Sequence, residues 1–201
     1  MKLLLATALF LFSLSSCAST KLNKGIGIET DAIVVQKAQE SGIAFISNGD
    51  QYQLISGGRA FATDMTTSGI SASQSHGLGE LLWEGVNGTF DLTISSQNAN
   101  QQNAQVLSNS TSYRQIAYNQ RTEGIAIITG QIIVTYTAEY DATFIATNFG
   151  IQLIYNFPHL NTAFYTLNPG QDIFLMTNSL NQSGIVSSAE VEVMENFSIP
   201  N

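Results

Sequence analysis

Two Asn-Gly pairs, each flanked by apolar residues at every second position, restrict the fold of this chain more than any other feature of its sequence. Type I′ turns need positive φ at both central residues, which Asn-Gly tolerates, so each pair predicts a β-hairpin with a two-residue loop. A loop at Asn48-Gly49 sets Phe45 opposite Tyr52 and Ile43 opposite Leu54 on one apolar face. This register predicts a half-buried antiparallel hairpin.

The second pair, Asn87-Gly88, predicts a hairpin with one wholly apolar face. Counting outward from the loop sets Trp83, the only tryptophan, opposite Leu92 and therefore in the core. The same count sets Glu84 directly opposite Asp91 on the other face. Like charges in that position destabilise a hairpin unless a cation offsets them.

Two explanations for this acidic pair follow from its charge. A neighbouring arginine (Arg59, Arg114 or Arg121) would make the pair structural, and we favour this explanation. A bound Ca²⁺, which prefers carboxylate and amide oxygens, would instead make Glu84 and Asp91 a metal site.

The remainder of the chain also predicts strands. Residues 123–140 and 144–157 are rich in β-branched and aromatic residues, and Ile151, Leu153, Tyr155 and Phe157 fall on one side of the second segment. The residues Asn168-Pro169-Gly170-Gln171 predict a turn between the strands TAFYTL and DIFLMT. The sequence AEVEVME predicts a last strand, in which Glu190 and Glu192 share a solvent face that protects a sheet edge.

These signals predict an all-β fold of roughly nine or ten strands, as an antiparallel β-sandwich with a closed β-barrel as the alternative. One short helix over Ala32–Ser41 can precede the strands, with Gly42 as its stop, although the sequence AIVV could equally begin a strand. We expect a single β-rich domain over residues 28–201.

The N-terminus predicts export. Lys2 precedes an apolar run from Leu3 to Leu14, too short to span a bilayer, and this pattern is typical of a secretory signal peptide. The following residues, Leu14-Ser15-Ser16-Cys17, resemble the lipobox of bacterial lipoproteins. The resemblance implies a signal peptide of residues 1–16 and a tether of residues 17–27, with acyl chains on Cys17. The alternative is ordinary cleavage after Ala18.

The same resemblance implies the location of the mature chain. Ala18 after the lipidated cysteine, where retained lipoproteins carry Asp, implies a lipid anchor in the outer membrane of a Gram-negative cell envelope. Cys17 is the only cysteine, so no disulfide can form within the chain. With 7 basic and 15 acidic residues, the surface should repel nucleic acid.

No catalytic or cofactor motif is present in the sequence. His76 and His159 lack partners at metal spacing, no Gly-x-Ser-x-Gly occurs, and the glycine pairs are not followed by a phosphate-loop lysine. The polar segment from Ser95 to Ser112 predicts a long surface loop. We therefore expect no catalytic residues and no cofactor.

Three functions are compatible with these features. The leading hypothesis is a lipid-anchored, non-enzymatic accessory or binding module of the cell envelope, with an envelope protein or glycan as its partner. The alternative is a carrier that holds an apolar ligand in a sandwich or barrel cavity. A hydrolase that uses carboxylates is the third.

Overall fold

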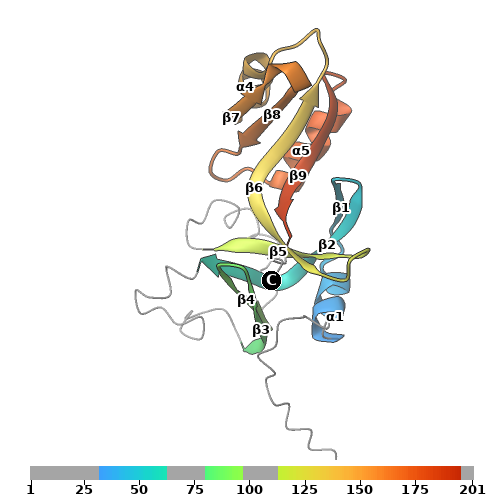
Figure 1. Cartoon of the computed structure of the whole chain (residues 1–201), viewed down its shortest axis with the longest axis vertical. Helices are drawn as coiled ribbons and strands as arrows, with labels where there is room; N and C mark the ends of the chain where they lie inside the picture. The colour runs from blue at the N-terminus through green and yellow to red at the C-terminus, as the bar shows by residue number, and fades with distance from the viewer. Residues whose placement is uncertain (1–31, 63–79, 97–112, 196–201) are drawn as a thin grey trace, which may run out of the picture.

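The computed structural model describes residues 32–62, 80–96 and 113–195, which form nine antiparallel strands in one open sheet and three α-helices (Figure 1). The elements are α1 (Ala32–Ser41), β1 (Ala44–Ser47), β2 (Asp50–Ala62), β3 (Leu81–Asn87), β4 (Phe90–Ser95), β5 (Arg114–Asn119), β6 (Ile125–Tyr136), α4 (Ala142–Phe149), β7 (Gln152–Phe157), the 3₁₀ helix η2 (Pro158–Leu160), β8 (Thr162–Thr166), α5 (Ile173–Gln182) and β9 (Val186–Met194). The sheet order is β3-β4-β2-β5-β6-β8-β7, with β1 beside β2 and β9 beside β6.

The predicted all-β fold, with nine strands and one short N-terminal helix, is confirmed. The alternative closed barrel is wrong, because the strands at the two ends of the sheet, β3 and β7, do not pair. Helix α1 has the predicted bounds, and Gly42 follows it at φ +66°, so the alternative strand at AIVV is also wrong.

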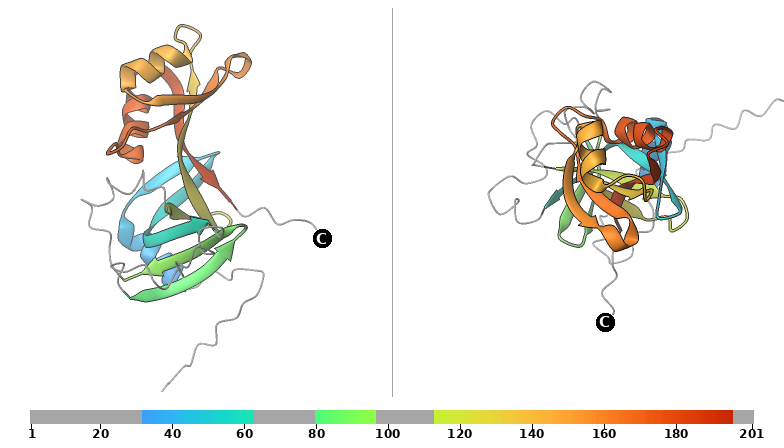
Figure 2. Two further views of the ribbon diagram at one scale, coloured as in Figure 1. Left: turned by 90° about the vertical axis from the view of Figure 1, so that its left-hand side faces the viewer. Right: turned by 90° about the horizontal axis from the view of Figure 1, so that it is seen from above.

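Strand β6 joins the two halves of the sheet. Its first residues pair with β5, its later residues pair with β8, and β9 follows its other edge. Gly130, at φ +85°, lies between the two parts in a conformation that other residues rarely adopt. The two halves of the predicted sandwich are therefore parts of one continuous sheet, which changes direction along β6 (Figure 2).

The later half of the sheet forms what we call the C-terminal lobe, residues 131–194. Helices α4 and α5 pack on the same face of its strands (Figure 2), and their buried residues join Ile132, Val134 and Val191 in one apolar core. The buried Tyr165 hydroxyl donates a hydrogen bond of 3.0 Å to the carbonyl of Ala142 at the start of α4. Only one face of this lobe is thus covered by helices.

Helices α4 and α5 occupy segments that we predicted as strands, and this part of the prediction is wrong. Their ends are fixed by local caps: the Asp141 carboxylate accepts from the Phe144 N–H, Gly150 closes α4 at φ 61°, and Asp172 accepts from the first N–H groups of α5. These caps, with apolar residues three and four apart, outweigh the high β propensity of the segments.

The first hairpin has the predicted register, with Phe45 opposite Tyr52. The second is shifted, because Asn87 pairs with Phe90 and the loop is Gly88-Thr89. The buried Asn87 side chain donates a hydrogen bond of 3.1 Å to the carbonyl of Ile125, and this tertiary contact draws Asn87 out of the loop.

The shift preserves the sheet faces but changes the residue pairs. Trp83 pairs with Ile94 and not with Leu92, although all three share one face. The Trp83 ring lies over Gly85, where an added Cβ would come within 2.4 Å of the ring. Trp83 is partly buried and packs against a second apolar core that includes Leu92, Ile94 and Ile116.

Several predictions concern residues outside the described ranges: Cys17, His76 and most of the polar segment that begins at Ser95. In the ranges that are described, no helix is long and apolar enough to cross a membrane.

Candidate functional site

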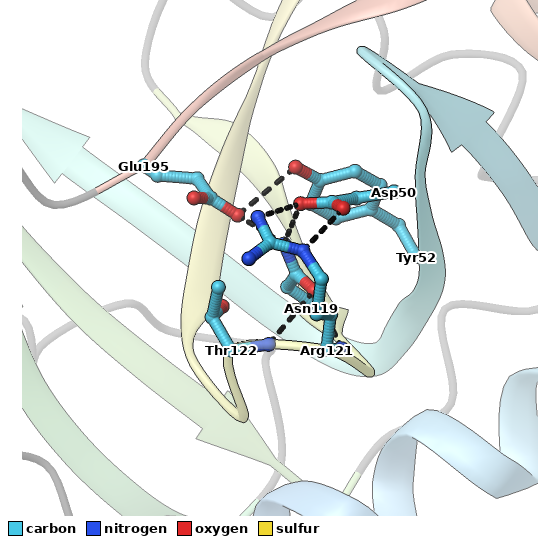
Figure 3. A network of polar contacts seen from close by, with 6 residues as sticks. All are labelled: Asp50, Tyr52, Asn119, Arg121, Thr122 and Glu195. Atoms are coloured by element: carbon cyan, nitrogen blue, oxygen red, sulfur yellow. Dashed lines mark hydrogen bonds and ion pairs between the residues drawn. The ribbon is translucent and has the colours of Figure 1, made fainter.

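A polar network brings together three distant parts of the chain (Figure 3). Asp50, at the first hairpin, forms a two-pronged ion pair with Arg121, with nitrogen–oxygen distances of 2.5 and 2.6 Å. The side-chain amide nitrogen of the fully buried Asn119 donates hydrogen bonds to the carboxylates of Asp50 and Glu195. The side-chain oxygen of Asn119 accepts hydrogen bonds from the backbone N–H groups of Arg121 and Thr122. The network therefore ties the start of β2, the β5–β6 turn and the end of β9.

The pKa values of Asp50 and Tyr52 in this network move away from neutrality. Hydrogen bonds from Arg121 and then from Asn119 lower the pKa of Asp50 to about 2. Burial, and then the 2.9 Å hydrogen bond to Glu195, raise the pKa of Tyr52. A general acid or base must titrate near the working pH, and Asp50 and Tyr52 do not. We conclude that the network is a structural clamp.

The predicted acidic pair is not formed. The register sets Glu84 opposite Thr93 and Asp91 opposite Val86, so the two carboxylates are diagonal neighbours. No group of three or more possible metal ligands occurs in the described parts of the chain.

The arginines that we proposed as neighbours of that pair have other partners. Arg59 lies 5.1 Å from the ring centre of Tyr113, Arg114 donates to the carbonyl of Thr129, and Arg121 pairs with Asp50. The favoured structural explanation is therefore wrong for the described residues.

The other predicted polar residues are exposed or half-buried. His159 is exposed in η2, in edge contact with the Phe157 ring. Glu190 accepts the Asn48 N–H at 2.7 Å, and Glu192 accepts from the Thr129 hydroxyl. Both acids lie on β9, which pairs only with β6 in the described sheet, so they are on an edge strand as predicted, but both are half-buried and not on a solvent face.

The face of the C-terminal lobe opposite α4 and α5 carries a row of apolar side chains, which we call the outer face. Directly paired residues cross four strands in the order Tyr155, Phe164, Ile133 and Glu190. Directly paired residues lie on the same side of a sheet. The row therefore runs from an aromatic residue at the β7 edge to a carboxylate on β9.

Aromatic contacts extend this row along the edge. The Phe164 ring makes edge contacts with Tyr155 and Phe157, at centroid distances of 6.3 and 5.9 Å. Tyr155 is 58% exposed and Leu160, in the adjoining η2, is 60% exposed. Contiguous exposed apolar side chains are typical of interaction sites.

A β-bulge produces the outer face, and it overturns one sequence prediction. Leu153 pairs with the buried Tyr165, but after a register shift at Ile154 the next pair is Tyr155 with Phe164. The extra residue reverses the alternation, because a strand side chain changes face at every step. We predicted that Tyr155 shares a face with Leu153, and this prediction is wrong. Tyr155 lies on the opposite face and is exposed.

The charges of the chain are divided unevenly. All 7 Lys and Arg precede residue 122, whereas residues 122–201 contain seven Asp and Glu and no Lys or Arg. The outer face thus belongs to a lobe that carries negative charge only. This pattern was readable from the sequence, but its relation to the aromatic edge was not.

The family model described as Open reading frame 2 N-terminal domain matches residues 36–199. The chain belongs to this family. A solved structure described as "Crystal structure of aeromonas sobria serine protease (ASP) and the chaperone (ORF2) complex" contains a similar chain, 17% identical, with a match covering 44% of this chain and 85% of that chain at a TM-score of 0.36. No curated protein matches the chain.

Proposed function

We propose that this protein is a non-enzymatic accessory protein of the cell envelope that binds a partner polypeptide and acts as its chaperone. The observation that carries the proposal is the exposed aromatic edge of the C-terminal lobe, at Tyr155 and Phe157. An exposed, uncharged sheet edge is a hazard that proteins normally cover, and it is a surface to which an unfolded or extended chain can add.

The polar network agrees with an accessory role, since its carboxylates are occupied by Arg121 and Asn119. The chaperone role is supported by the family's name, Open reading frame 2, which matches the designation ORF2 of the chaperone in the Aeromonas sobria complex.

We also propose that Cys17 carries the lipid that anchors the protein in the outer membrane. The support is the resemblance of Leu14-Ser15-Ser16-Cys17 to the lipobox. Several acyl chains, each adding ~0.8 kcal/mol per buried methylene, hold a protein firmly on a bilayer. Intact-mass analysis of the native protein should show residues 17–201 plus acyl mass. An unlipidated N-terminus at Ser19 would contradict the anchor.

The chaperone proposal is tested by suppression of aggregation. Residues 17–201 with Cys17→Ser should reduce the light scattering of reduced lysozyme when the two proteins are present in comparable amounts. Double substitution Tyr155→Ser and Phe157→Ser should abolish most of this effect, whereas Leu175→Ser, at a residue 61% exposed on α5, should not. The proposal would be contradicted if the Cys17→Ser chain without further substitution suppressed the aggregation of none of the clients tested.

A further inference from the structure

We propose that the β7 edge and the outer face bind an extended segment of the partner that is apolar and carries Lys or Arg. This inference rests on the proposed function and specifies the surface and the chemistry of what it holds.

The first argument concerns the sheet edges. Among the described strands, β7 pairs only with β8, so the backbone groups on its other side face away from the sheet. The edge strands β3 and β9 contain Glu84 and the pair Glu190 and Glu192, respectively. The edge strand β1 has no charge but is only four residues long, and such short edges add further strands poorly. The six-residue sequence of β7, QLIYNF, contains no charge. Edge charges prevent the addition of a further strand, and β7 lacks this protection.

The second argument concerns the side chains that an added strand would meet. From Tyr155 to Phe157 the strand is regular after the bulge, and both side chains point to the outer face. Leu160 continues the exposed apolar surface at the end of the strand. An added strand with apolar residues at alternate positions would set them against these rings.

The third argument concerns charge. The charged side chains of the C-terminal lobe are all acidic: Glu139, Asp141, Asp172, Glu190 and Glu192. Asp141 and Asp172 cap the helices on the opposite face, whereas Glu190 lies in the outer-face row. A second copy of this chain would bring like charges together and is therefore disfavoured as the occupant. Anionic lipid and nucleic acid are disfavoured for the same reason. A segment with Lys or Arg beside its apolar residues has the complementary charge.

Three synthetic peptides of ten residues test the inference by fluorescence anisotropy with the Cys17→Ser chain. The first alternates Lys with Val and Phe, the second has Glu in place of every Lys, and the third has Ser in place of every Val and Phe. We expect the first to bind about tenfold or more tightly than either other peptide. Its binding should weaken as salt rises, because the screening length falls from ~10 Å at 0.1 M to ~3 Å at 1 M.

Variants then locate the binding surface. Tyr155→Ser with Phe157→Ser leaves the net charge unchanged and should weaken binding of the Lys peptide about tenfold or more. Leu175→Ser should leave it unchanged, and circular dichroism should show that both variants are folded. Equal binding of the Lys and Glu peptides, no binding of any peptide, or equal loss in both variants would overturn the inference.

The aggregation assay separates this inference from the proposed function. Reduced lysozyme is basic, and reduced α-lactalbumin has the same fold with an acidic sequence. The inference predicts protection of lysozyme at a lower chaperone concentration than α-lactalbumin. Equal protection of both would leave the chaperone proposal intact and refute the charged docking surface.

Discussion

Replacing Asn119 by Asp tests the polar clamp most sharply, because the two side chains have the same shape. The change removes the amide donor that binds Asp50 and Glu195 and sets a third carboxyl group between them. Each lost hydrogen bond to a charged acceptor contributes about 1.5–3 kcal/mol. The introduced carboxyl group can avoid repulsion by taking a proton, which costs about 1.4 kcal/mol per pH unit from its ordinary pKa of roughly 3.9.

Protonation at pH 7 costs about 4 kcal/mol and restores one of the two donors, so we expect Asn119→Asp to lower the free energy of unfolding at pH 7 by about 5–6 kcal/mol at most. At pH 4 the carboxyl group is protonated at little cost, and the loss relative to the unmodified chain should fall to about 1–2 kcal/mol. Urea unfolding followed by the fluorescence of Trp83, the only tryptophan, measures both values.

The matched control is Asn178→Asp, at an exposed position in α5, which should change stability by less than about 0.5 kcal/mol. A cost for Asn119→Asp that is the same at pH 4 and pH 7, or no cost at pH 7, would refute the description of the network as a charge-dependent clamp.

Three further predictions concern single interactions. Arg121 lowers the pKa of Asp50 to about 2, so the stabilisation of the folded state by this ion pair is complete above the unfolded pKa of roughly 3.9 and is lost as pH falls toward 2. Arg121→Gln should flatten this part of an acid-unfolding curve, and an unchanged curve would contradict the prediction. Gly85→Ala places a methyl group against the Trp83 ring and should shift the tryptophan emission to longer wavelength, whereas unchanged emission would mean that the ring lies elsewhere. Asp141→Ala removes the N-cap of α4 and should cost about 1 kcal/mol in chemical denaturation; no loss would show that the cap contributes nothing.

Sequence alone predicted those elements whose signals are local. The Asn48-Gly49 loop set the register of the first hairpin, Gly42 ended α1, and the turn at Asn168-Pro169-Gly170-Gln171 formed with Gly170 at φ +88°. In each case a residue that tolerates positive φ occupies the turn position, and the other residues that form the turn are its neighbours in the sequence. The caps Asp141 and Gly150 of α4 are equally local, and we missed them because β-branched and aromatic residues outweighed them in the pattern.

Tertiary contacts decided the features on which the functional proposals depend. The register of the second hairpin differs from the prediction because the Asn87 side-chain amide donates to the carbonyl of Ile125, 38 residues away. Turn preferences depend on adjacent residues and cannot predict such a contact. The clamp required Asp50, Asn119 and Glu195 to meet from separate strands. The bulge at Ile154 placed Tyr155 on the outer face, because register is selected by what each side chain meets across the sheet, and one inserted residue reverses every later position.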